Sequence, residues 1–199
     1  MRTDRRTLAG LLLLVGSVQF LLAMLVGEGM RPDFSISTNP ISDLGVGSTA
    51  LLFNTSIVIL GLLILGAAWL YHGAYKRLWV TIPFLLAGVG PIGVGLFPET
   101  TGTPHLVFAF ISFFFGGLLA ILTAFPTRPP FRYMSIVLGV VGLVALVLYA
   151  THTYLGIGDG GMERMIAYPV LFWGIAFGGY LMASPSTPEA KPAPEAPAS

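Results

Sequence analysis

The chain has 199 residues, of which 55% are hydrophobic and 10% charged, and its formal net charge is +1. A soluble globular domain is about a quarter charged, so this composition predicts a protein whose solvent is a lipid bilayer, and the small net charge argues against a nucleic-acid partner. The absence of cysteine excludes disulfides, thiolate metal sites and cysteine nucleophiles.

Six apolar stretches follow one another along the chain, at 8–26, 50–70, 78–97, 106–125, 133–150 and 166–182. Each has about 17 to 21 residues, which at a rise of about 1.5 Å per residue spans a hydrocarbon core of about 30 Å. We therefore expect an all-α, polytopic bundle of six transmembrane helices in residues 1–183, with the first apolar run retained as a span rather than removed as a signal peptide. The Pro-, Ala- and Glu-rich residues 184–199 predict a disordered cytoplasmic tail.

Charge placement predicts the orientation of these spans. With the N-terminus inside, the outer segments hold only two basic residues, Arg31 and Arg164, and the inner segments hold the other eight: Arg2, Arg5, Arg6, Lys76, Arg77, Arg128, Arg132 and Lys191. Most acidic residues fall outside: Glu28, Asp33, Asp43, Glu99, Asp159 and Glu163. Because positive charge is retained on the cytoplasmic side, we expect a multi-pass protein of the cell membrane with both termini in the cytoplasm.

The longest outer loop, 27–49, contains a short helix signal. Asn39 can cap a helix, Pro40 suits its first position, and Gly45 can end it. We expect this segment to fold down onto the outer mouth of the bundle.

Glycines mark two of the spans. In the third, Gly88, Gly90 and Gly93 have the spacing of the G-x-G-x-x-G dinucleotide-binding motif. That motif needs a preceding β-strand, and here it lies inside an apolar span, so we reject a dinucleotide site. Close helix packing is the favoured interpretation, and Pro91 among these glycines predicts a kink or local unwinding. In the sixth, Gly174 and Gly178 form a G-x-x-x-G motif that serves either contacts within the chain or oligomerisation.

Seven polar residues that are far apart in sequence map to the outer ends of the spans: Ser42, Asp43, Asn54, His105, His152, Glu163 and Arg164. Each has a structural explanation, such as capping, solvation or an interhelical hydrogen bond, and together they favour a shared polar site. Glu163 and Arg164 are consecutive on a helix and point about 100° apart, so each needs another partner. We expect Asp43 to pair with Arg164, and His105 with Glu163.

Two classes of function remain open. In the first, the protein is not an enzyme and binds a lipid headgroup or small amphiphile through Ser42, Asn54 and Arg164. In the second, it is an intramembrane lipid-processing hydrolase or transferase, with His105 as general base, Asp43 or Glu163 orienting it, and Arg164 holding a phosphate or an oxyanion. No metal-ligand spacing supports a metal site, a channel has little support, and no cofactor is indicated.

A family resemblance rests on several of these residues. The chain resembles the uncharacterised membrane family called domain of unknown function 998. The residues that carry this resemblance are 39–45, Asn54, His105, 161–164 and Tyr168–Pro169. The resemblance covers nearly all six spans and implies a six-helix bundle without an established activity. The stretch 40–45 is also similar to a loop of the Frag/DRAM/Sfk membrane proteins, which implies a connection with lipids.

The predicted topology can be tested with reporter fusions. Fusions placed after Arg77, after Arg128 and at the C-terminus should all report a cytoplasmic location, because basic residues gather in these segments. A periplasmic or extracellular signal at Arg128 would show that the orientation is wrong.

Overall fold

The computed structural model describes residues 4–183, so the predicted tail, 184–199, lies outside the described residues. Within 4–183 the chain forms six long helices and no strand: α1 Arg5–Gly29, α2 Ala50–Tyr75, α3 Leu78–Leu96, α4 Thr103–Ala124, α5 Phe131–Ala150 and α6 Gly158–Ala183. Three short 3₁₀ helices lie in the connections: η1 Ile41–Gly45, η2 Gly47–Thr49 and η3 Glu99–Thr101. All six long helices are long and apolar enough to cross a membrane, which confirms the predicted fold class.

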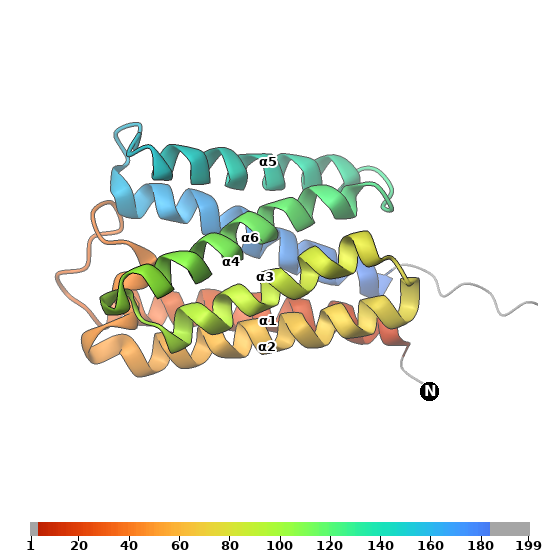
Figure 1. Cartoon of the computed structure of the whole chain (residues 1–199), viewed down its shortest axis with the longest axis horizontal. Coiled ribbons are helices and arrows are strands. Elements are labelled where there is room, and N and C mark those ends of the chain that lie inside the picture. Colours follow the sequence, from red (N-terminus) through yellow and green to blue (C-terminus); the bar gives the residue numbers. More distant parts are fainter. Residues whose placement is uncertain (1–3, 184–199) are drawn as a thin grey trace, which may run out of the picture.

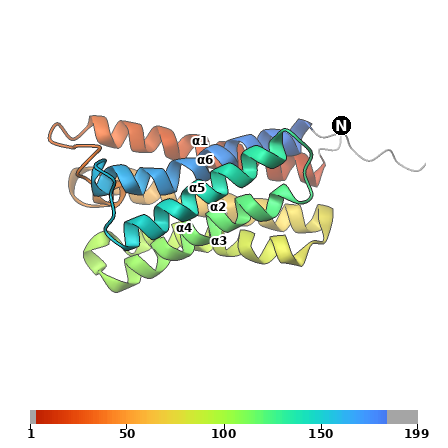
Figure 2. The same ribbon diagram turned by 90° about the horizontal axis from the view of Figure 1, so that it is seen from above.

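The helices are arranged as a closed, antiparallel bundle (Figures 1 and 2). Each packs against its neighbour in sequence, and α6 returns to pack against α1. The three 3₁₀ helices lie at one end of the bundle, which we call the loop end, and the opposite end holds the start of α1 and the end of α6 (Figure 1). The loop end therefore corresponds to the side that the sequence predicts to be the outer side.

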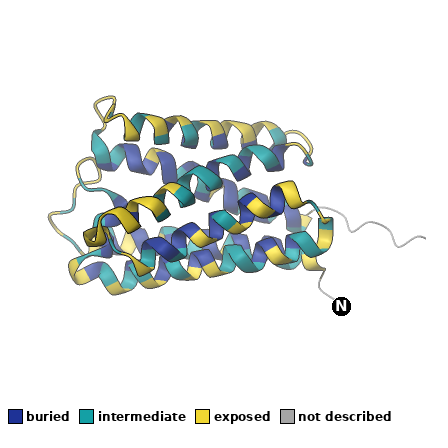
Figure 3. Cartoon of the chain, in the orientation of Figure 1, coloured by how far each residue is buried: buried dark blue, intermediate teal, exposed yellow. Residues whose placement is uncertain are grey.

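Apolar side chains cover the outside of the bundle as well as its interior. Figure 3 shows buried positions facing inward and exposed positions facing outward on the helices. Large exposed hydrophobic residues include Leu25, Trp69, Phe110 and Val147, which are between 54% and 71% exposed. A surface of this kind suits hydrocarbon and not water, so the chain is a multi-pass membrane protein.

Close packing, and not local unwinding, explains the glycines of α3. The helix is unbroken from Leu78 to Leu96, so it does not unwind around Pro91, and the kink that was the other form of the prediction stays a prediction. A Cβ atom at Gly90 would lie 2.4 Å from the backbone nitrogen of Ser112, and one at Gly88 would lie 2.8 Å from Leu65. These glycines therefore let α4 and α2 approach α3 closely, as the packing interpretation predicts.

Helix α6 begins at Gly158, whereas the apolar pattern predicts a start near Ile166. The glycines at 158–161 suggest a flexible loop but have a packing role. A Cβ atom at Gly160 would lie 2.3 Å from the carbonyl oxygen of Asn39. The segment before η1 thus packs directly onto the first turn of α6, and Glu163 and Arg164 lie inside the helix.

The G-x-x-x-G motif of α6 faces α1 within the same chain. A Cβ atom at Gly174 would lie 2.4 Å from Oγ of Ser17, and one at Gly178 would lie 2.6 Å from the carbonyl oxygen of Gly10. Oligomerisation through these two glycines would therefore require α1 to move away from α6.

Gly178 and Gly179 offer a matched pair of variants for testing this contact. Gly178→Ala should destabilise the protein by about 1–3 kcal/mol, because its methyl group meets backbone atoms of α1. Gly179→Ala should be neutral or slightly stabilising, because a Cβ atom there meets nothing within 4 Å. Thermal melts in detergent measure both, and equal melting temperatures for the two variants would contradict the packing.

Candidate functional site

The η1 helix folds onto the loop end of the bundle, as predicted. It contacts α1, α2 and α6, and the side chains of Ile41 and Leu44 are 4% and 0% exposed. The backbone N–H of Ile41 donates to the Glu163 carboxylate, so the start of η1 is fixed to the second turn of α6. Because both partners are buried, this hydrogen bond is stronger than one exposed to water.

Arg164 fixes the preceding part of the loop through a different set of partners. Its guanidinium forms a salt bridge with Glu28, at the end of α1, with a closest N–O distance of 2.6 Å. It also donates to the carbonyl oxygens of Ile36, Asn39 and Gly160. The predicted pairing of Arg164 with Asp43 is therefore wrong, because Glu28 reaches Arg164 from the neighbouring helix and holds the charge that Asp43 was expected to supply.

Asp43 belongs to the outer surface of the loop. Its carboxylate accepts a hydrogen bond from the side-chain amide of Asn39 at 2.8 Å, and its backbone carbonyl accepts one from Arg31. Arg31, Asp43 and Glu99 line a shallow polar depression between the loop and η3. Asp43 thus connects two loop segments and does not line the interior of the bundle.

Glu99 lies beside Asp43 and titrates near neutrality. Its pKa is raised to about 7, first because the surrounding protein removes water from the carboxyl and then because the Asp43 carboxylate lies next to it. The Ser42 hydroxyl hydrogen-bonds to Glu99 and opposes this shift. The two carboxyl groups therefore carry less than two full negative charges at pH 7.

His105 lies near the start of α4 and is 5% exposed. Its Nδ1 is 2.8 Å from the carbonyl oxygen of Phe97, at the end of α3. Because a carbonyl can only accept, Nδ1 carries the proton, and Nε2 of the neutral ring is an acceptor. Within residues 4–183, Nε2 forms no hydrogen bond.

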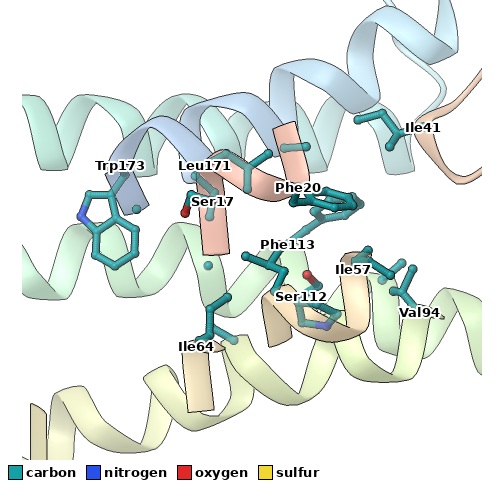
Figure 4. A pocket seen from close by; sticks show the side chains of 18 of the residues that line it. Ser17, Phe20, Ile41, Ile57, Ile64, Val94, Ser112, Phe113, Leu171 and Trp173 are labelled. Atoms are coloured by element: carbon teal, nitrogen blue, oxygen red, sulfur yellow. The ribbon is translucent and has the colours of Figure 1, made fainter. Parts of the chain in front are cut away.

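A cavity runs through the interior of the bundle from the loop end (Figure 4). Its volume is about 90 Å³, and its walls come from α1, α2, α3, α4, α6 and η1, with no residue from α5. Most wall residues are apolar, among them Phe20, Ile57, Ile64, Val94, Phe113 and Leu171. Figure 4 places Ile41 and Trp173 toward opposite ends of the cavity.

Polar groups are concentrated at one end of this cavity. Ser42, His105 and Glu163 line it near the loop end, while Ser17 and Ser112 are the hydroxyl groups further along. His105 and Glu163, from helices far apart in sequence, therefore face one cavity, although no hydrogen bond joins them within the described chain. The convergence predicted from the sequence holds for these three residues.

The other predicted site residues lie elsewhere. Asn54 donates to the carbonyl oxygen of Gly45, so its hydrogen bond joins α2 to the end of η1 and not to another membrane span. His152 is exposed, and its Nδ1 contacts the hydroxyl of Tyr154. Among residues 4–183, no three His, Asp or Glu side chains come close enough together to hold a metal ion.

Sequence reasoning missed Glu28, Ile41 and the apolar cavity walls. Glu28 is one of six acids on the outer side, and nothing in the sequence distinguishes it as the partner of Arg164. The wall residue Trp173 shows no separate signal either. Its indole N–H donates to Ser135, at 2.9 Å, as a packed tryptophan requires.

Comparison with known proteins gives a family but no activity. The model of the family described as "Protein of unknown function (DUF998)" matches residues 14–180 of the chain. No curated protein and no solved structure matches. The similarity of the 40–45 loop to the Frag/DRAM/Sfk proteins stays a prediction.

The pairing of Arg164 with Glu28 makes a direct stability prediction. Their side chains are 5% and 13% exposed, so removing either charge leaves the other stranded at a cost of about 3–5 kcal/mol. Arg164→Gln and Glu28→Gln should each lower the melting temperature, and the double variant should cost less than the sum of the two.

Asp33→Asn provides the matched control, because Asp33 is an exposed acid of the same loop. It should leave the melting temperature unchanged. Strictly additive effects of Arg164→Gln and Glu28→Gln would show that the pair is not coupled.

Proposed function

The chain belongs to the DUF998 family of unknown function, and we propose that it binds a single-chain amphiphile inside its helical bundle. The observation that carries this proposal is the cavity: an apolar passage between the helices with polar side chains at one end. Ligand sites in proteins have this character, with mostly apolar walls and a few polar groups that fix orientation.

The apolar walls of the cavity suit a hydrocarbon chain. A water molecule needs roughly 10–15 Å³ of such space, so a cavity of about 90 Å³ has room for several. Water gains little there, because it finds few polar partners along walls such as Phe20, Ile57 and Leu171. An apolar chain can fill this space and contact the walls throughout.

The polar end sets the direction of the ligand. Trp173 lies ten residues beyond Glu163 on α6, which corresponds to about 15 Å along the helix axis. An amphiphile with its head beside Glu163 would extend its chain toward Trp173, parallel to the helices. The head would then lie at the loop end, at the level of η1.

An intramembrane enzyme is the second candidate, and one observation favours it. His105 lines the cavity and its Nε2 has no hydrogen-bond partner within the described residues, so in the neutral ring this nitrogen could accept a proton from a bound substrate. Arg164, however, is occupied by Glu28 and three backbone carbonyls, so it does not supply the oxyanion or phosphate contact of that mechanism. Chemical conversion of a bound chain that is lost in His105→Gln would support this candidate.

Tryptophan fluorescence can test chain binding directly. Trp69 and Trp79 are 71% and 47% exposed and can be replaced by Phe, which leaves Trp173 as the single reporter. Dodecanol brominated at its terminal carbon should quench Trp173 in a saturable manner in phosphatidylcholine nanodiscs. Unbrominated dodecanol should restore the signal by competition.

Two cavity-filling variants and a surface control complete the test. Ala167→Leu and Ala109→Leu place extra methyl groups in the cavity and should each weaken quenching at least about tenfold. Val144→Leu, on the exposed face of α5, should leave quenching unchanged. Non-saturable quenching, or equal quenching in all three variants, would contradict chain binding in the cavity.

A further inference from the structure

The polar end of the cavity presents acceptors to a ligand. Glu163 is 7% exposed and lines the cavity, and its carboxylate accepts hydrogen bonds from the backbone N–H groups of Ile41 and Ser42. His105 presents Nε2, which is an acceptor in the neutral ring whose Nδ1 donates to the carbonyl oxygen of Phe97. A ligand group that donates hydrogen bonds can satisfy both, whereas one that only accepts can satisfy neither.

Charge favours a cation at the same place. Among residues 4–183, no Lys, Arg or His forms an ion pair with Glu163. Its neighbour Arg164 attracts it at a distance but forms its salt bridge with Glu28. A buried carboxylate without a cation in direct contact is costly, so a cationic ligand would gain more from Glu163 than a neutral one.

The surroundings reinforce this preference. Apart from Glu163, the loop end holds five acidic side chains and two basic ones, a formal excess of three negative charges: Glu28, Asp33, Asp43, Glu99 and Asp159 against Arg31 and Arg164. Arg31 is bound to the Asp43 carbonyl and lies over the Phe34 ring, so neither arginine faces the cavity. A field of this sign attracts cations to the polar end and repels carboxylates and phosphates.

We propose that the amphiphile bound in the cavity carries a protonated amine, whose N–H groups donate to the Glu163 carboxylate and to Nε2 of His105. This inference rests on the proposed function, since it concerns the head group of the same ligand. It separates amines from quaternary ammonium groups, which carry charge but have no N–H to donate. It also separates them from fatty acids and simple alkyl phosphates, which bring only negative charge.

Displacement of brominated dodecanol from Trp173 tests the choice of head group. Four competitors share one chain: dodecylamine, dodecanol, dodecanoate and dodecyltrimethylammonium. Dodecylamine should displace the probe at a concentration roughly tenfold lower than dodecanol, because a charge-assisted hydrogen bond is worth about this factor or more. The quaternary ammonium should fall between these two, and dodecanoate should be the weakest.

The four compounds partition unequally into the bilayer, which affects their apparent potency. Comparing protein variants corrects for this, because each compound partitions equally whichever variant is present. Glu163→Gln should reduce the advantage of dodecylamine over dodecanol about tenfold. His105→Phe should reduce it as well and keeps the test usable if Glu163→Gln does not fold. Glu99→Gln, which removes a carboxyl outside the cavity, should preserve most of the advantage.

The outcomes separate the two proposals. Equal displacement by dodecanol and dodecylamine, or stronger displacement by dodecanoate, would overturn the amine and leave chain binding intact. A loss of preference as large in Glu99→Gln as in Glu163→Gln would overturn direct contact with Glu163. Failure of all four compounds to displace the probe would overturn chain binding itself.

Discussion

Glu163 and Arg164 hold the long 30–49 connection against the bundle, and the arrangement of the loop end depends on this pair. Because they are consecutive on α6, their side chains leave the helix about 100° apart and reach different targets. Glu163 turns toward the cavity and receives the N–H of Ile41, while Arg164 turns toward α1 and pairs with Glu28. One turn of helix therefore fixes both η1 and the segment before it.

This attachment also shapes the cavity. With the start of η1 fixed to α6, Ile41 and Ser42 become wall residues of the cavity where it reaches the loop end. A purely structural role for Glu163 and a role in binding are therefore compatible. The same carboxylate can accept from the backbone on one side and face a ligand on the other, because a carboxylate has about four acceptor positions.

The sequence predicts the large features of this fold because they depend on local patterns. Apolar run length gives the six helices, and the Pro40–Gly45 signal gives η1. The grouping of Ser42, His105 and Glu163 follows from the direction in which each span crosses. The glycines of α3 show the limit of composition: Pro91 among them suggests a kink or unwinding, yet the helix is continuous and the glycines lie against α2 and α4.

The remaining features depend on which side chains meet across the bundle, and no local pattern encodes that. Glu28 and Asp43 are both outer acids, and only the packing of α1 against α6 decides that Glu28 reaches Arg164. The sequence does not reveal where α6 starts, because a glycine such as Gly160 usually indicates a flexible loop. In the structure Gly160 is helical, and because it has no side chain the backbone of Asn39 can pack against it. The cavity cannot be predicted from the sequence either. An apolar residue such as Ile57 or Leu171 gives the same sequence pattern whether its side chain packs against a neighbour or lines a cavity.

The central claim is that the interior of the bundle holds a hydrocarbon chain whose head lies beside Glu163. The most direct measurement is anomalous diffraction from crystals grown in a lipid mesophase with dodecylamine brominated at its terminal carbon. The account predicts a bromine peak inside the bundle near Trp173, with density continuing toward Glu163 and His105. Bromine found only on the lipid-facing surface, with the cavity empty or closed by its own side chains, would contradict it.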